Sequence, residues 1–193
     1  MTTEPTEEDR RLAIAAGAGD RRAFEQLVGR HKGALYRLAR RYVGDADEAY
    51  DIVQETFVSV WLALRQFDPR QSFIGWLRTI ALNKCRDHGR RRAVRRRVLR
   101  FFALEPVVST QSFTSDSERE RDEESQRRSQ RLDQAVAELP RLYKEPLLLT
   151  TVGGLTQQEA ARVLRTTTKA VEMRIRRARN RLIETLGNGS ETK

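Results

Sequence analysis

The chain has 193 residues, of which 38% are hydrophobic, and its 37 lysines and arginines against 27 acids give a formal net charge of +10 at pH 7. This length predicts one ordinary domain or two small ones, and the basic excess favours a polyanionic partner such as nucleic acid. The N-terminus is acidic and polar, unlike a signal peptide, and no apolar run reaches the roughly 18 residues that span a bilayer. We therefore expect a cytoplasmic protein without membrane insertion.

The predicted elements are all helices, because apolar side chains recur at three-and-four spacing and no convincing period-two alternation is found. A first helix is expected between Asp20, which can cap it, and Gly44, which ends it. Asp45 with Glu48 three residues later has the form of a capping box for a helix over residues 46–67. The fold class is therefore predicted to be all-α.

The next helix, "SFIGWLRTIALNKCRDHGRRR" from Ser72 to Arg92, begins with a core-forming apolar face and ends as a basic run. Such a helix can serve a hydrophobic core and a charged partner at once. Trp76 lies at a spacing that favours a place in the core over stacking on a nucleic-acid base.

The composition of the rest of the chain separates a polar linker from a second helical domain. From Arg86 to Arg100 there are eight arginines and one acid, and from Asp116 to Glu124 there are six acids and two arginines. These stretches and the Ser/Thr-rich residues between them are too polar to bury a core, which is typical of a flexible linker. The prediction is two small helical domains, residues 1–92 and 129–187, joined by a flexible linker, 93–128, and followed by a disordered tail, 188–193.

The second domain contains the pattern of a helix-turn-helix, "LTQQEAARVLRTTTKAVEMRIRRARNRL". Thr156 and Glu159 predict a capping box for a short helix through Leu164, and Thr167 can cap a second helix that reaches about Leu186. The second helix carries six basic and two acidic residues, and the basic side chains are suited to bind phosphates and guanine edges in a major groove. The alternative is a solvated basic helix packed on a bundle.

Five motifs in this order, "GDRRAFEQLV", "DIVQETFVSVW", "FIGWLRTIALN", "LPRLYKEPLLL" and the helix-turn-helix, resemble the extracytoplasmic-function (ECF) sigma factors of bacterial RNA polymerase. The resemblance covers about residues 20–92 and 132–186. It implies a region 2 that melts and reads the minus-10 element and a region 4 that reads the minus-35 element. It also implies core RNA polymerase and promoter DNA as partners and an anti-sigma factor as regulator, with no cofactor, catalytic residue or small-molecule substrate.

The resemblance assigns three sets of residues. Core polymerase binding is expected from Asp51, Gln54 and Glu55, minus-10 DNA binding from Arg78, Asn83, Lys84 and Arg86, and minus-35 DNA binding from Lys169, Glu172, Met173, Arg174, Arg176 and Arg177. Asn83 matches the position that reads a base flipped from the stack, while its alternative role is to cap or brace the end of its helix. Asp51 and Glu55 could instead be merely solvated. The chain departs from the family at Arg165, where glycine is common and a left-handed backbone would be less comfortable for arginine, and at Glu172, where a basic residue is common.

Two alternatives from other functional classes stay open. Asp47, Asp51 and Glu55 at four-residue steps could bind a divalent ion in a nuclease, but the sequence offers no nucleophile and no second metal-binding cluster. A helix-turn-helix transcriptional repressor without polymerase binding is the stronger alternative.

Other side chains with reactive or metal-binding chemistry have simpler interpretations. His31 and His88 are far apart and are expected to be surface histidines rather than metal ligands. Cys85, the only cysteine, is expected to pack as a small hydrophobe rather than act as a redox switch.

Overall fold

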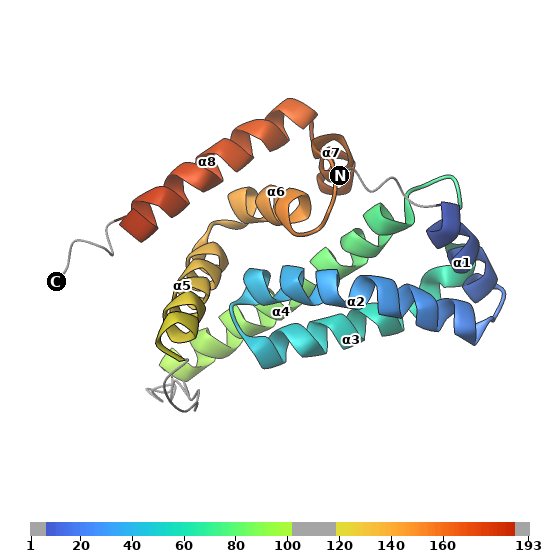
Figure 1. Ribbon diagram of the computed structural model, residues 1–193, viewed down its shortest axis with the longest axis horizontal. Coiled ribbons are helices and arrows are strands. Elements are labelled where there is room, and N and C mark those ends of the chain that lie inside the picture. Colours follow the sequence, from blue (N-terminus) through green and yellow to red (C-terminus); the bar gives the residue numbers. More distant parts are fainter. Residues whose placement is uncertain (1–6, 102–118, 188–193) are drawn as a thin grey trace.

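The computed structural model describes residues 7–101 and 119–187, and the side chains within 7–95 and 129–187. Two groups of helices lie against each other, the first within residues 7–101 and the second within residues 119–187. In Figure 1, α6 (Arg141–Thr151) lies between α8 (Thr168–Gly187) and the long helix α2 (Arg21–Val43). No strand occurs in the described residues, which confirms the all-α prediction. The elements are α1 (Glu7–Gly17), α2 (Arg21–Val43), α3 (Ala46–Ala63), a short 3-10 helix (Leu64–Gln66), α4 (Phe73–Phe101), α5 (Arg119–Glu138), α6 (Arg141–Thr151), α7 (Gln157–Leu164) and α8 (Thr168–Gly187).

The predicted ends of α2 are confirmed. The Asp20 carboxylate accepts hydrogen bonds from the backbone N–H groups of Arg22, at 2.8 Å, and Ala23, at 3.2 Å. At the other end Gly44 adopts a left-handed conformation with φ of 82°, which a residue with a Cβ atom adopts only with strain. The sequence therefore fixes the length of α2 through local hydrogen bonding and backbone freedom.

The predicted capping box of α3 is half formed. The Asp45 carboxylate accepts a hydrogen bond from the Glu48 backbone N–H at 2.9 Å. The Glu48 carboxylate instead faces α4, where it lies 3.1 Å from His88 Nε2 and 3.4 Å from an Arg92 nitrogen. Glu48 thus ties the start of α3 to the basic end of α4.

Helix α1 was not predicted from the sequence. It packs on α2 through the carboxylate of Asp9, which is 2% exposed and lies 3.0 Å from His31 Nε2 and 3.0 Å from Arg30 Nε. The expectation that His31 is a surface residue is wrong, because its side chain is buried beneath α1. This ionic contact and the buried side chains of Ala13 and Ala16 together hold the first helix in place.

Buried apolar side chains of both groups form one continuous cluster. Phe73, Leu77 and Cys85 place the inner face of α4 in it, which confirms the packing role expected of the cysteine. Trp76 is partly buried with its ring centroid 5.0 Å from that of Phe67, so the core interpretation of this tryptophan is also confirmed.

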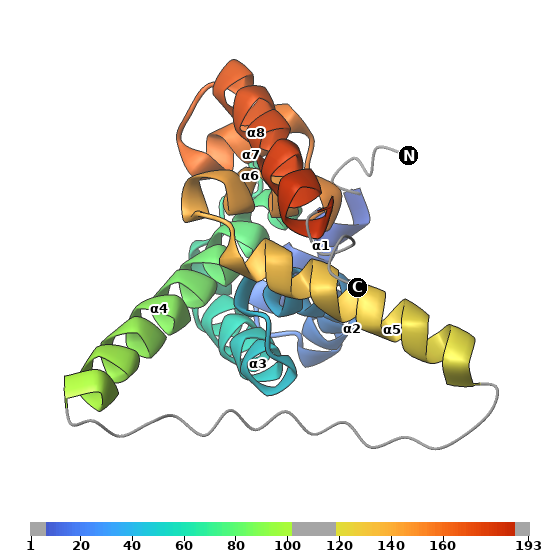
Figure 2. The ribbon, with the colours of Figure 1, turned by 90° about the vertical axis from the view of Figure 1, so that its left-hand side faces the viewer.

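The segment predicted as a linker is helical at both of its ends. Helix α4 continues past Arg92 to Phe101, and α5 already begins at Arg119, because arginine, glutamate and glutamine are strong helix formers even where no core is buried. Figure 2 shows these two helices extending apart from the body of the molecule. The core of the predicted linker, residues 102–118, lies outside the described residues.

Candidate functional site

An exposed stripe runs along α3, and it begins with the residues predicted to bind polymerase. Asp51 and Glu55 are exposed and are followed at helical spacing by Val58 and Leu62, whose exposed fractions are 59% and 72%. We call these four residues the α3 stripe. Since apolar side chains of this size cost free energy in water, a stripe that combines them with carboxylates is typical of a protein-binding surface.

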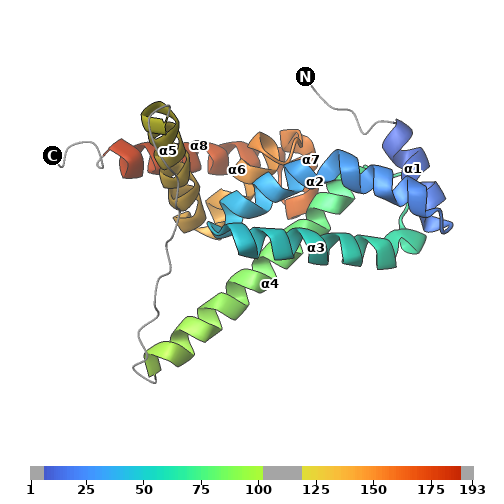
Figure 3. The same cartoon turned by 60° about the horizontal axis from the view of Figure 1, so that its bottom comes forward.

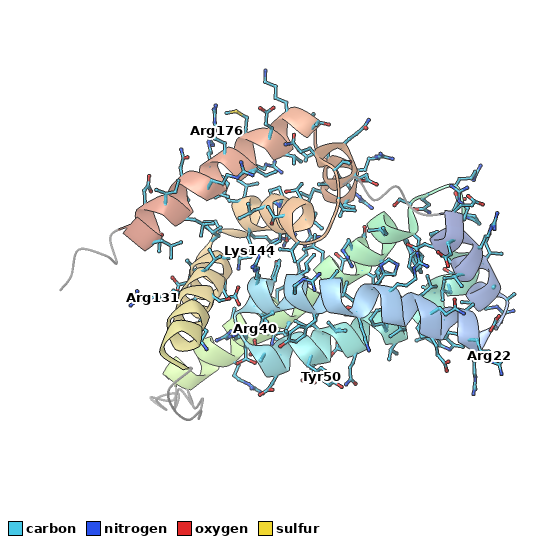
Figure 4. All side chains as sticks on the ribbon, in the orientation of Figure 1. Arg22, Arg40, Tyr50, Arg131, Lys144 and Arg176 are labelled. Carbon is cyan, nitrogen blue, oxygen red and sulfur yellow. The ribbon has the colours of Figure 1, made fainter. Side chains whose placement is uncertain are left out.

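An open apolar groove of about 880 Å³ adjoins the α3 stripe, between α2 and α3, which lie side by side in Figure 3. Tyr36 of α2 and Tyr50 of α3 are exposed at the groove, and the predicted Gln54 also lines it. Tyr50 points outward from α3 in Figure 4. The apolar part of this surface was missed from the sequence, although a helix with apolar residues on more than its core face was the available signal.

The α3 stripe also touches the helix predicted to bind the minus-10 strand. A carboxylate oxygen of Glu55 lies 3.7 Å from Lys84 Nζ, and the other lies 3.8 Å from an Arg91 nitrogen. Exposed pairs at such distances contribute little to stability, so the Glu55 charge stays available to a partner.

The four predicted minus-10 residues lie on α4 in different environments. Asn83 is exposed and Lys84 is half-buried. Arg86 is half-buried and donates to Asn83 Oδ1 at 3.1 Å. Arg78 is 2% exposed and donates through Nε to the Gly153 carbonyl at 3.0 Å. Asn83 lies well inside α4, which continues to Phe101, so the alternative that it caps the helix end is wrong.

Burial gives Arg78 unusual electrostatics. Desolvation, assisted by the nearby positive charge of Arg37, lowers the pKa of its guanidinium to about 10. Among the described residues no carboxylate pairs with Arg78, and its Nη1 atom has no hydrogen-bond partner. In this arrangement Arg78 therefore does not face solvent, where a phosphate could reach it.

Arg86 is held by the second group of helices. Its Nε and Nη2 atoms donate to the two carboxylate oxygens of Glu145 on α6 at 2.8 and 2.6 Å. Glu145 also accepts from Arg141 Nε at 2.7 Å and from the Tyr42 hydroxyl at 3.2 Å. This hydrogen-bonded ion pair raises the pKa of Arg86, which stays charged.

The helix-turn-helix forms as predicted from α7 and α8. Thr156 and Glu159 make both hydrogen bonds of a capping box, at 3.2 and 2.8 Å, and the Thr167 hydroxyl accepts from the Ala170 backbone N–H at 3.1 Å. Val171, Ile175 and Ala178 bury the inner face of α8; the other face is free to meet a partner.

The predicted minus-35 residues divide between two sides of α8. Four of them are exposed: Lys169, Glu172, Arg176 and Arg177. Arg176 points away from α6 in Figure 4 and lies 3.3 Å from the sulfur of the half-buried Met173. Arg174 is also half-buried, and it lines a cavity together with Arg86 of α4 and Arg141 of α6. It therefore lies on the side of α8 that faces the other helices, not on the outer face of α8.

Comparison with known families supports this architecture. The chain matches the family Sigma-70 region 2 over residues 27–95 and the family Sigma-70, region 4 over residues 129–182. It is 38% identical to RNA polymerase sigma factor CnrH of Cupriavidus metallidurans over 97% of this chain and 98% of that protein. It is also 31% identical to the ECF RNA polymerase sigma factor SigE of Mycolicibacterium smegmatis, covering 98% of this chain and 73% of that protein. The chain belongs to the ECF sigma factors.

Solved structures agree with the family assignment. The structure of CnrH in complex with the cytosolic domain of CnrY matches this ECF sigma factor with a TM-score of 0.71 and 36% identity, over 94% of this chain and 99% of that one. The fold also matches the sigma factor RpoE of Bartonella quintana, in complex with the anti-sigma factor NepR, with a TM-score of 0.65 over 85% of this chain and 96% of that one. The family consists of transcription initiation factors, so this protein binds core RNA polymerase and directs promoter recognition, DNA melting and initiation. The findings do not support the repressor alternative.

No group of three or more His, Cys, Asp or Glu side chains within the described residues of this sigma factor is placed to hold a metal ion. None of the helices that these residues form is long and apolar enough to cross a membrane.

The sigma factor also carries a backbone strain that the sequence indicated. Arg165, in the turn between α7 and α8, adopts a left-handed conformation with φ of 51°. We expect Arg165→Gly to stabilise the protein by up to about 1 kcal/mol, because glycine adopts this conformation without a Cβ clash. Urea denaturation measures the change. The matched control is Arg162→Gly in the last turn of α7, which should lose about 1 kcal/mol because its backbone is helical. Equal losses at the two positions would contradict the strain.

Proposed function

We propose that this sigma factor uses three separate surfaces, the α3 stripe with its groove for core polymerase, α4 for the single-stranded minus-10 element and α8 for the minus-35 duplex. The α3 stripe is the observation that most strongly supports this proposal. In a chain with a net charge of +10 it presents two exposed carboxylates in line with two exposed apolar side chains, beside an open apolar groove. A basic partner helix with its own apolar residues would satisfy both kinds of group.

Helix α4 has side chains that are suited to bind single-stranded minus-10 DNA. The exposed Asn83 amide has a donor and an acceptor, which can bond a base edge bidentately. Lys84 beside it is a point charge suited to a phosphate. Capture of a flipped base offsets part of the few kcal/mol that unstacking costs. The basic end of α4 would follow the strand backbone electrostatically.

Helix α8 supplies the duplex contact through its outer face. We expect Arg176→Ala with Arg177→Ala to weaken binding to minus-35 duplex DNA and to reduce the slope of log affinity against log salt by about two, since each lost phosphate contact removes about one. Fluorescence anisotropy over a salt series measures both quantities. Arg131→Ala on α5, exposed and pointing outward from α5 in Figure 4, is the control and should change the slope little. An unchanged slope in the double variant would remove these two arginines from the interface.

A regulatory partner follows by analogy with the relatives. The matched structures hold sigma factors bound to CnrY and to the anti-sigma factor NepR. We therefore propose that an anti-sigma protein also binds this chain. The proposed location is the cytoplasm, because core polymerase and promoter DNA are there, and the proposed role requires neither a catalytic residue nor a cofactor.

The function is tested with purified components. The chain is mixed with core RNA polymerase, and the stoichiometry of the complex is measured by size exclusion. Run-off transcription on a library of random upstream sequences then identifies the promoter that the complex selects. A folded chain that neither binds core polymerase nor directs transcription from any template would overturn the proposal.

A further inference from the structure

Glu172 places a negative charge on the surface proposed to meet duplex DNA. Its side chain is exposed and lies in the N-terminal half of α8, the part of a recognition helix that faces base edges in helix-turn-helix complexes. Exposed basic residues surround it, with Lys169 one turn before it and Arg176 one turn after it. A carboxylate here is repelled by the phosphates that these two residues attract, so it weakens binding unless the DNA donates a hydrogen bond to it.

The stability of α8 does not account for Glu172. A glutamate can stabilise a helix through the helix dipole when it lies in the first turn, but the first turn of α8 holds no acidic residue. A glutamate can also pair with an arginine four positions later, which here is Arg176. The Arg176 guanidinium instead lies 3.3 Å from the Met173 sulfur, and no ion pair joins it to Glu172 among the described residues. The carboxylate therefore keeps its acceptor oxygens available to a ligand.

The hydrogen-bond donors of a DNA duplex limit the bases that suit a carboxylate. In the major groove only cytosine N4 and adenine N6 are donors, whereas guanine O6 and N7 and thymine O4 are acceptors that repel a negative charge. Adenine also places its N7 acceptor beside N6, where it would face the second carboxylate oxygen, and cytosine has a carbon atom in that place. Cytosine is therefore the base that Glu172 fits. The guanine of the same base pair suits a donor such as Lys169.

We infer that Glu172 determines the sequence preference of the minus-35 contact, because its carboxylate accepts a hydrogen bond from the N4 amine of one cytosine. The inference rests on the proposed function, since it takes the exposed side of α8 as the surface that meets the duplex. One position of the minus-35 element then requires a C·G pair, and the wrong base leaves the carboxylate beside an acceptor. The phosphate contacts of Arg176 and Arg177 supply affinity, and Glu172 supplies discrimination.

The test uses the holoenzyme that forms from the full chain and core RNA polymerase. The template is the promoter selected in the transcription library, with each of the four base pairs placed in turn at every minus-35 position. Run-off transcription at limiting template measures the preference at each position. For the unmodified chain we expect one position at which C·G is preferred over every other pair by about tenfold or more, as one good base contact provides.

Two substitutions separate base reading from a general effect of charge. Glu172→Ala should reduce the preference at that position to about twofold or less, while the preferences at the other positions persist. Glu172→Gln should move the preference from C·G to A·T, because an amide can bond adenine N6 and N7 together. Glu184→Gln, which neutralises the other glutamate of α8 at an exposed position near the C-terminal end, is the matched control and should change no preference.

A glutamate that only repels DNA would give a different pattern. Its removal would strengthen binding to every duplex by the same factor and leave all base preferences as they were. Fluorescence anisotropy of the full chain with a duplex of unrelated sequence measures this general effect, which should be about twofold for Glu172→Ala. The melting temperature of each variant verifies that it is folded.

Unchanged preferences in the folded Glu172→Ala variant, or no C·G preference in the unmodified chain, would overturn the inference and leave the proposed function intact. An equal loss of preference at every minus-35 position would also overturn it, because that pattern indicates a displaced helix rather than a lost base contact. No transcription from any template by the unmodified chain would remove the proposed function, and the inference with it.

Discussion

Replacement of both Asp51 and Glu55 by arginine is expected to weaken binding to core RNA polymerase by at least about 100-fold, because like charges placed across an ionic interface cost several kcal/mol. Both side chains are exposed and neither is part of the core, so the melting temperature should change little. Affinity is measured by fluorescence anisotropy with labelled sigma factor and increasing core polymerase. The matched control is Glu172→Arg with Glu184→Arg, which makes the same change of charge on exposed positions of α8 and should leave core binding unaffected.

Leu62→Asp tests the apolar half of the α3 stripe without touching an ion pair. Glu55→Arg places its new charge near Lys84 and Arg91, and this local repulsion could contribute to the loss in the double variant. Leu62 is 72% exposed and should therefore tolerate aspartate without unfolding, while a contact that buries it would be lost. Unchanged core affinity in both folded variants would remove the α3 stripe from the polymerase interface.

Local signals explain why much of the fold could be predicted. Capping residues such as Asp20 and Thr156 bind backbone groups only two or three positions away, so their hydrogen bonds can be predicted from residue type and spacing alone. The strain at Arg165 was equally local, because it depends on one residue type in one turn. The helix-turn-helix was predictable for the same reason.

Contacts between distant parts of the chain explain what could not be predicted. Helix α1 packs on α2 partly through Asp9, whose partner His31 lies 22 positions away, and a polar N-terminus gave no sign of this pairing. Glu48 has the spacing of a capping box, but its carboxylate contacts His88 and Arg92 of α4 instead. An arginine on a largely polar face suggests exposure, but the burial of Arg78 depends on where region 4 packs.

Asn83→Ala is expected to lose discrimination at one position of the minus-10 element by about 1–3 kcal/mol, while the affinity for unrelated single strands changes little. Lys84→Ala, the matched control on the next residue, should weaken all strands nearly equally, because a phosphate contact carries no sequence information. Run-off transcription with each of the four bases at every minus-10 position separates the two patterns. The melting temperatures of both variants are measured as a control for stability.

The structure sharpens the alternative for Asn83. Since α4 continues to Phe101, Asn83 does not end the helix, and within the part of the chain that the structure describes its side chain makes one hydrogen bond, from Arg86 at 3.1 Å. If Asn83 only braces Arg86, its loss should weaken every promoter together and mimic Arg86→Ala, whereas a base-reading amide should leave the other positions intact. A uniform drop that matches the Arg86→Ala profile would therefore refute the base-reading role, and a loss confined to one base position would establish that the amide, rather than the positive charge around it, reads the sequence.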